Sequence, residues 1–173
     1  MNTVYPTSRG GAQGFTLTEV SIAMALIGVG ILSLLHAMGA GTNVNAAGRE
    51  LTQAAFLAQE IREWTVQLPF RDPDPDDAGN PPGPDGTSPQ TFVDDLDDLM
   101  GVTYSPPRDA TGTAITGMTD WSQTITLEWR TPENLLTTVT AGSSDVICVF
   151  VTIRHRGRDV HTSSWLVFDR EAP

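Results

Sequence analysis

Residues 14–38 read GFTLTEVSIAMALIGVGILSLLHAM, a long apolar run with one carboxylate, Glu19, near its start. Between Phe15 and Met38 there is no Lys, Arg or Asp. At about 1.5 Å of rise per residue, about 20 apolar residues in a helix cross the hydrocarbon core of a bilayer. A carboxylate inside such a helix costs about 2.5 to 3.5 kcal/mol and usually has a partner. The run therefore predicts a membrane-spanning helix in which Glu19 needs a partner.

The segment before the run, residues 1–14, contains no acidic residue, and its positive charges are Arg9 and the amino terminus. Because positive charge precedes the span and a strongly acidic region follows it, we expect this end to stay in the cytoplasm and the rest to be exported. A secretory signal peptide has an apolar region of roughly 7 to 15 residues, so this run is too long for one. A plain single-pass anchor fits the length but leaves Glu19 unexplained.

The basic leader, the Gly14-Phe15 junction, Glu19 five residues into the run and the long apolar stretch occur together. In this combination they closely resemble the processing site of type IV prepilins and of the pseudopilins of type II secretion. The resemblance implies that a prepilin peptidase cleaves between Gly14 and Phe15 and methylates the new amino terminus of Phe15. It also implies an inner-membrane protein that joins other pilin or pseudopilin subunits in a filament through inner-membrane assembly machinery.

Cleavage would give Glu19 its partner, because it would place a cationic amine on Phe15 beside hydrocarbon. A cation and a carboxylate attract strongly in low dielectric, and each is otherwise costly to bury. Within one helix the two groups lie about one turn apart, roughly 6 Å of rise. The resemblance implies instead that Glu19 meets the amine of a neighbouring subunit and sets its axial register. A pair within one subunit is the alternative, above all before assembly.

Composition and motifs disfavour nucleic-acid binding, catalysis and a bound cofactor. The chain has 10 Lys+Arg, all of them Arg, against 21 Asp+Glu, a formal net charge of -11, so we expect no nucleic-acid partner. The single cysteine, Cys148, cannot form an intramolecular disulfide, and within an apolar strand it is typical of a buried small hydrophobe. The sequence has no serine elbow and no Gly-rich phosphate loop. We therefore expect neither an enzyme nor a bound cofactor.

Beyond the span, the helical pattern continues over residues 39–69. Pro69 ends it, because the residue before a proline avoids the α region. Glycines in residues 39–48 each lower helix propensity by up to about 1 kcal/mol, so these positions favour either a kink or close helix packing. Apolar and small residues at steps of three and four predict a face that packs on the exported domain. They are Leu51, Ala54, Leu57, Ala58, Ile61, Trp64, Thr65 and Leu68.

Residues 70–101 form an acidic region rich in proline and glycine, whose first part should lack regular structure. Its alternating aspartates lack the glycine and the closing glutamate of an EF-hand. Its last part has apolar residues at helical steps, which predicts a short helix or ordered turn whose aspartates face water. Some pseudopilins bind calcium, but a solvated acidic loop is the favoured interpretation here. The weak candidate calcium ligands are Asp94, Asp95, Asp97 and Asp98.

Residues 102–173 are rich in strand patterns. In residues 121–130, WSQTITLEWR, large apolar side chains alternate with polar ones, which predicts a half-buried strand. Residues 135–140 are a weaker strand candidate. Residues 145–155 are apolar on both faces, as in a central strand.

A hairpin turn is expected at residues 156–159, with Gly157 at its first central position. This register would pair Phe150 with Trp165, and Cys148 with Val167, on the face against the helix. It would also place His155 and His161 on opposite faces, which disfavours a joint site.

The predicted fold class is α+β, pilin-like: a long N-terminal transmembrane helix whose C-terminal half packs on a small antiparallel sheet. The expected segments are a removed leader (1–14), a membrane or filament-core helix (15–38), its exported continuation (39–69), the acidic region (70–101) and the sheet (102–173). Many major pilins close a C-terminal loop with a disulfide, so within this resemblance the lack of a second cysteine favours a minor pilin or a type II secretion pseudopilin over a main fibre subunit. A membrane-anchored binding module, displayed in the periplasm or outside the cell, is the alternative from another class.

Overall fold

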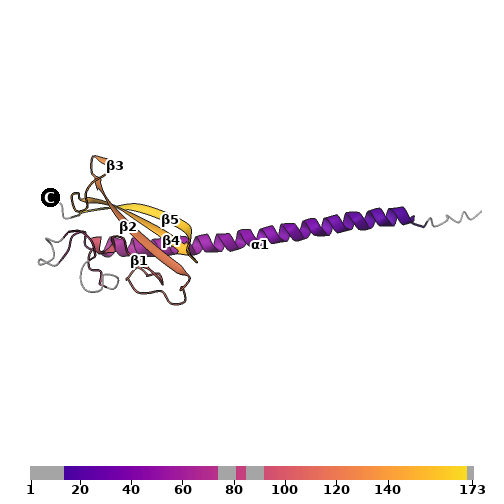
Figure 1. The fold of residues 1–173 in the computed structure, drawn as a ribbon, viewed down its shortest axis with the longest axis horizontal. Coiled ribbons are helices and arrows are strands. Elements are labelled where there is room, and N and C mark those ends of the chain that lie inside the picture. The colour runs from indigo at the N-terminus through magenta and orange to yellow at the C-terminus, as the bar shows by residue number, and fades with distance from the viewer. Residues whose placement is uncertain (1–13, 74–80, 85–91, 171–173) are drawn as a thin grey trace, which may run out of the picture. The chain divides into compact units, whose positions relative to one another are not determined.

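The computed structural model describes residues 14–73, 81–84 and 92–170. The chain divides into two compact units, one ending at Ala46 and the other beginning at Ala47. A single long helix, α1 (Leu17–Gln67), begins in the first unit and ends in the second (Figure 1). The second unit adds a short 3-10 helix and five strands within the described residues. They are η1 (Asp97–Leu99), β1 (Thr103–Tyr104), β2 (Trp121–Thr131), β3 (Asn134–Thr138), β4 (Val146–His155) and β5 (Arg158–Phe168).

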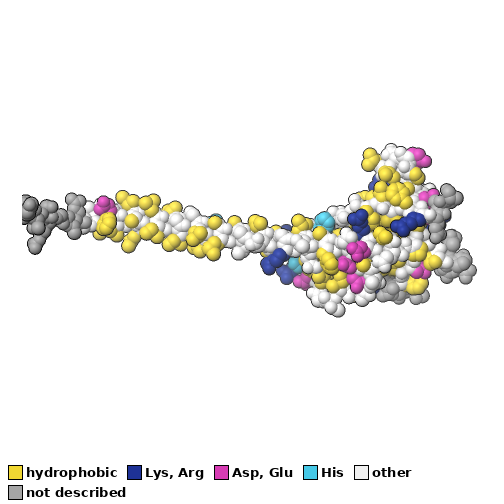
Figure 2. Space-filling view, turned by 180° about the vertical axis from the view of Figure 1, so that it is seen from behind, with side chains coloured by type: hydrophobic (Ala, Val, Ile, Leu, Met, Phe, Trp, Pro, Cys, Tyr) yellow, Lys and Arg dark blue, Asp and Glu magenta, His cyan; other side chains and the backbone are white. Residues whose placement is uncertain are grey.

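The part of α1 in the first unit is apolar and wholly exposed. It contains an 18-residue window that is long and apolar enough to span a membrane, and none of that window is buried. Figure 2 shows apolar side chains along its visible face. The hydroxyls of Ser21 and Ser33 donate to the carbonyls of Leu17 and Val29, at 2.9 and 2.8 Å, so these polar groups are satisfied inside the helix. The helix continues through residues 39–48 without a break.

The part of α1 in the second unit buries one face in the core of the domain. Six of the eight residues of the predicted stripe are buried, and Leu68 packs against the core from just beyond the helix. The prediction was wrong for Leu51, whose side chain is 50% exposed. The preceding residue, Glu50, contacts His155, the last residue of β4, so Glu50 and not Leu51 faces the sheet at this level of the helix.

The strands form one antiparallel sheet in the order β1-β2-β4-β5, with β3 paired to the end of β2. Figure 1 shows the C-terminal half of α1 against this sheet. The core consists of the buried face of α1, residues around η1 and the inward side chains of β2 and β4. The α+β layout, a long N-terminal helix on a small antiparallel sheet, is therefore confirmed.

Strand β2 shows the predicted alternation and one polar exception. Ile125, Leu127 and Trp129 are buried, as their odd spacing predicts. Gln123, on the same face, is fully buried. Its amide nitrogen donates to the carbonyl of Leu57 in α1 at 2.9 Å, and its oxygen accepts the backbone N–H of Arg108 at 2.7 Å. Because buried polar groups are stable only when paired, Gln123 joins the helix and a loop to the sheet.

The hairpin between β4 and β5 differs from the predicted register by one residue. Its central residues are Arg156 and Gly157, both with positive φ (51° and 76°), as a type I′ turn requires. In this conformation the backbone N–H of Arg156 donates to the carbonyl of Asp120 at 2.7 Å, and Arg156 Nε lies 3.1 Å from the Asp120 carboxylate.

Relative to the prediction, this shift exchanges the two faces of β4, because side chains alternate with a period of two, whereas Trp165 and Val167 of β5 keep the predicted face against the core. Val149 pairs with Trp165, and Ile147 pairs with Val167. Val149 and Ile147 therefore face the core, whereas Cys148 and Phe150 lie on the outer face. A register shift at Ile153 and Arg154 separates the turn from the rest of the ladder.

The prediction that His155 and His161 lie on opposite faces was also wrong. Both lie on the side of the sheet that α1 covers: His155 Nδ1 is 2.6 Å from Glu50 Oε1, and His161 borders a hollow beside Ala58 of α1. The ring of His155 also stacks on Trp121 with centroids 4.3 Å apart. The two histidines contact different parts of the helix.

Replacement of Gly112 is expected to destabilise the domain. Gly112 has φ +75°, and a Cβ there would lie 2.6 Å from the Trp64 ring, which is buried in the core. The left-handed conformation costs about 1 to 2 kcal/mol for other residues, and overpacking costs about 1 to 3 kcal/mol more. Urea unfolding followed by tryptophan fluorescence should show Gly112→Ala losing about 2 to 5 kcal/mol.

Gly117 provides the matched control. It has a similar φ of +80°, but a Cβ there meets nothing within 4 Å. Gly117→Ala should therefore lose only about 1 to 2 kcal/mol. Equal losses in the two variants would contradict the close approach of Gly112 to Trp64.

Candidate processing and assembly segment

The Gly14-Phe15 junction lies before the first turn of α1 in non-helical backbone. Phe15 is 86% exposed, and a Cβ built on Gly14 would meet nothing within 4 Å. A peptidase must bind its substrate in an extended form, which a helical junction would resist. This geometry leaves the predicted scissile bond open to an enzyme without unwinding the helix.

Thr16 and Glu19 close the first turn of α1 in a reciprocal capping box. Glu19 Oε2 accepts the backbone N–H of Thr16 at 2.9 Å and its hydroxyl at 2.8 Å. The Thr16 hydroxyl oxygen in turn accepts the backbone N–H of Glu19 at 3.3 Å. Two N–H groups that would otherwise lack partners are thereby satisfied, and a negative charge lies at the positive end of the helix dipole.

Sequence reasoning found Glu19 but missed Thr16. The signal was present as the spacing Thr-x-x-Glu before an apolar run, which is the pattern of a capping box. The structure places the Glu19 carboxylate on the backbone of Thr16, directly after Phe15. Cleavage would therefore create an amine on Phe15, next to Thr16, the residue that binds the Glu19 carboxylate at the start of the helix.

The four aspartates considered for calcium lie around η1, and the carboxylates of Asp95, Asp97 and Asp98 accept hydrogen bonds from backbone amides. Asp95 Oδ1 accepts the N–H groups of Asp97 and Asp98 at 2.9 and 3.1 Å. Asp98 Oδ2 accepts the N–H of Asp94 at 3.0 Å, and Asp97 Oδ1 accepts that of Gly83 at 3.2 Å. In the parts of the chain that the structure describes, no group of three or more His, Cys, Asp or Glu is arranged to hold a metal ion.

The prediction that these aspartates face water was wrong for two of them. Asp95 and Asp98 are only 3% and 2% exposed. Their carboxylates are drawn inward because the turn around η1 leaves N–H groups that need acceptors. The apolar residues predicted to dock on the domain were Phe92, Leu96, Leu99 and Met100. Leu96 and Leu99 are fully buried, whereas Phe92 and Met100 are 52% and 37% exposed.

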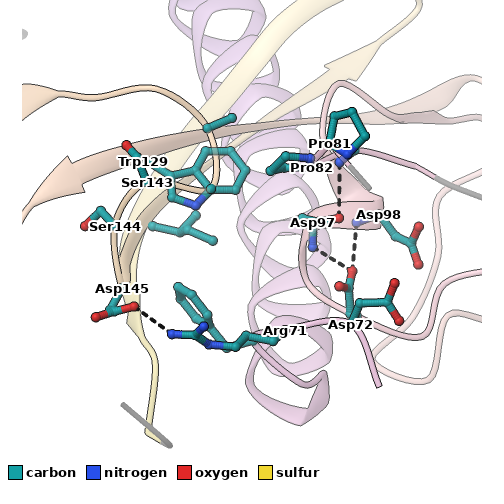
Figure 3. Close-up of a pocket in the computed structure, with 16 residues that line it drawn as sticks. Arg71, Asp72, Pro81, Pro82, Asp97, Asp98, Trp129, Ser143, Ser144 and Asp145 are labelled. Carbon is teal, nitrogen blue, oxygen red and sulfur yellow. Dashed lines mark hydrogen bonds and ion pairs between the residues drawn. The ribbon is translucent and has the colours of Figure 1, made fainter. Parts of the chain in front are cut away.

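A hollow of about 610 Å³ lies beside this turn (Figure 3). Asp97 and Asp98 form one side of it, and Arg71 and Asp145 form the other. Arg71 Nη2 lies 2.9 Å from Asp145 Oδ1, and its Nε lies 2.6 Å from Asp169 Oδ2. These ion pairs join the segment after α1 to the residue before β4 and the residue after β5, which lie side by side at the end of the β4-β5 pair far from its turn.

Burial raises the pKa of Asp95 to about 7, although its bonds from backbone amides oppose the shift. An unfolded aspartate ionises near pH 3.9. The folded chain therefore binds more protons than the unfolded chain between about pH 4 and pH 7. In that window the contribution of Asp95 to stability falls as pH rises.

Asp95→Asn is expected to stabilise the domain at pH 8, because the amide oxygen can still accept from Asp97 and Asp98 without burying a charge. The gain should be about 1 to 3 kcal/mol at pH 8 and smaller at pH 5, measured by urea unfolding. Asp109→Asn is the control and should have the opposite effect on stability at pH 8. Hydrogen bonds from Thr111 and Thr113 lower the pKa of Asp109, so its charged form is the one that the fold stabilises. A gain from Asp95→Asn that did not depend on pH would contradict the burial of its charge.

Cys148 is half-buried on the outer face of β4. Burial raises the pKa of its thiol, which disfavours the reactive thiolate. This environment suits a packing role.

Comparison with known proteins identifies the N-terminal segment. Residues 9–35 match the family model described as the prokaryotic N-terminal methylation motif. The chain therefore carries the signal of type IV prepilins and pseudopilins across the Gly14-Phe15 junction and the first turns of α1. No curated protein and no solved structure matches the chain.

Proposed function

We propose that this protein is a minor, type IV pilin-like subunit of a filament assembled at the inner membrane. A prepilin peptidase cleaves it between Gly14 and Phe15 and methylates the amine of Phe15. Residues 15–38 hold the chain in the membrane until assembly machinery extracts it. Residues 39–173 are exported to the periplasm or cell surface, and the polypeptide serves as a structural subunit without catalysis.

One observation carries this proposal: the methylation motif coincides with an exposed junction that directly precedes a capped apolar helix. The motif supports processing by a prepilin peptidase. The structure adds that Gly14 and Phe15 are accessible and that Glu19 is held at the helix terminus. A plain membrane anchor needs none of these three features.

Assembly uses Glu19 together with the amine that cleavage creates. Before cleavage, the Glu19 carboxylate is bound to Thr16 of its own chain. After cleavage, the amine of a neighbouring subunit competes for that carboxylate. Because an unpaired charge in low dielectric costs several kcal/mol, the pair favours the one axial position in which both charges are satisfied.

The same segment would serve a pseudopilin of type II secretion, and deletion distinguishes these machines by phenotype. Loss of surface filaments is expected for a pilus subunit, and loss of secreted proteins for a pseudopilin. Complementation with the intact chain should restore the lost property. Normal filaments and normal secretion in the deletion strain would contradict a structural role.

A displayed binding module is the second candidate, and a groove on the exported domain favours it. In that case filaments would form normally without the protein, while adhesion or uptake of a partner would be lost.

A further inference from the structure

Strand β5 is the free edge of the sheet. It spans eleven residues, Arg158–Phe168, and within the described residues no strand pairs with its outer side. Natural sheets usually protect such edges with charges, prolines or bulges. From Val160 to Phe168 the sequence VHTSSWLVF has no charged residue and no proline, and the one register shift lies at the hairpin end. This edge is therefore available for hydrogen bonds to another strand.

A groove follows this edge, with α1 as its other wall. Two hollows, of about 310 and 300 Å³, lie one after the other along the seam between α1 and β5. The first has Ala58 and Arg62 of α1 opposite Ser163 of β5. The second has Val66 of α1 opposite Val167. The small side chains of α1 leave room beside the strand, as an added strand requires.

The charge of the groove is opposite to that of the chain. Its lining includes Arg62 and Arg170, whereas a third arginine, Arg71, is ion-paired with two carboxylates, those of Asp169 and Asp145. The chain as a whole has a formal net charge of -11. An acidic segment is therefore complementary to this surface, and a basic one is disfavoured.

A second copy of this chain is a poor occupant under the proposed function. Antiparallel pairing of β5 with another β5 would relate the two chains by a two-fold axis perpendicular to the sheet. The partner's α1 would then run in the opposite direction. Subunits anchored in one membrane need their helices parallel. Such pairing is therefore incompatible with a shared membrane or filament.

We propose that the groove between α1 and β5 binds an extended, acidic segment of a different exported polypeptide, which adds to the sheet as a strand beside β5. Backbone hydrogen bonds along the free edge provide affinity, as in other strand additions. A carboxylate facing Arg62 provides selectivity. The opposite side of the added strand lies beside Leu166 and Phe168 on the outer face of the sheet, which favours apolar residues at alternate positions.

The test uses the full-length chain in detergent and defined nine-residue peptides. Each peptide alternates Thr and Val, and its central residue is Glu, Gln or Lys. Hydrogen exchange measures protection of the β5 amides, with β4 as the internal reference. We expect the Glu peptide to protect β5, the Gln peptide to bind about two- to five-fold more weakly, and the Lys peptide to bind weakest.

Two matched controls separate strand addition from general attraction. A Glu peptide with alternate amides N-methylated keeps its side chains but cannot complete the ladder, so it should give no protection. Arg62→Gln should weaken binding of the Glu peptide about two- to five-fold. Arg49→Gln removes an exposed charge on the same helix outside the groove and should leave binding unchanged.

Four results would overturn the proposal. They are equal binding of the Lys peptide, equal protection by the N-methylated peptide, no β5 protection by any peptide at millimolar concentration, and β5 protection that depends on protein concentration alone. The last result would assign the edge to a second copy. None of these results depends on processing at Gly14, so the proposal can fail while the proposed function stands.

Discussion

Gly14→Val is expected to leave the chain at its precursor length, with residues 1–14 retained. In the structure a Cβ at Gly14 meets nothing within 4 Å, so the substitution does not disturb the fold. The loss would arise in the peptidase, because a site shaped for glycine before the cut excludes a branched side chain. We expect cleavage to fall at least ten-fold, corresponding to about 1.4 kcal/mol or more in the barrier. The measurement is the intact mass of the membrane-bound chain in cells that express the peptidase.

Gly28→Ala is the control for this experiment. Gly28 lies in the same apolar helix, and a Cβ there also meets open space. This variant should be cleaved normally. Normal cleavage of Gly14→Val would show that processing, if it occurs, uses another bond.

Glu19→Val is expected to be cleaved and methylated but to enter filaments poorly. Removing one partner of a buried ion pair leaves the amine of Phe15 uncompensated in low dielectric, at a cost of about 3 to 5 kcal/mol. Incorporation should therefore fall by about a hundred-fold or more at equal expression. The measurement compares the variant in sheared filaments with that in the membrane fraction. Normal incorporation would remove the assembly role of Glu19.

Thr16→Val separates helix capping from ion pairing. This change removes the hydroxyl of the capping box but keeps the carboxylate of Glu19 and its bond from the Thr16 backbone N–H. Loss of a cap costs about 1 kcal/mol, so incorporation should decline far less than in Glu19→Val. Equal defects in the two variants would show that Glu19 acts by capping its own helix.

The features that sequence could predict are those set by local periodicity. The buried stripe of α1 follows steps of three and four from Ala54 to Thr65, and β2 alternates from Trp121 to Trp129. Such patterns persist because one face meets the core along the whole element. The pattern did not predict that Glu50 faces the end of β4, which is why Leu51 was assigned to the wrong environment.

The features that sequence missed depend on contacts between distant segments. The β4-β5 register depends on the positive φ of Arg156. In this conformation Arg156 bonds to Asp120, which lies thirty-six residues away in the sequence. Gln123 is buried because Leu57 and Arg108 provide partners from two other segments. None of these contacts has a signal at a fixed spacing.

The candidate site could be proposed from the sequence because its residues lie within six consecutive positions. Gly14, Phe15 and Glu19 are recognisable from their order alone, and the family match covers them. Thr16 was missed because Glu19 was interpreted as a charge within the membrane span and not as part of a helix cap. The groove along β5 could not be predicted, since it requires the edge of the sheet and α1 to be placed together.

Mass spectrometry of the amino-terminal peptide, from chain purified out of membranes that contain the peptidase, tests the proposed function most directly. The result we predict is a mature chain that begins at Phe15 with one methyl group on its α-amine. A chain that retains Met1 or begins at another residue would contradict processing at the Gly14-Phe15 bond. With it would fall the assembly role proposed for Glu19, since the partner amine would not exist.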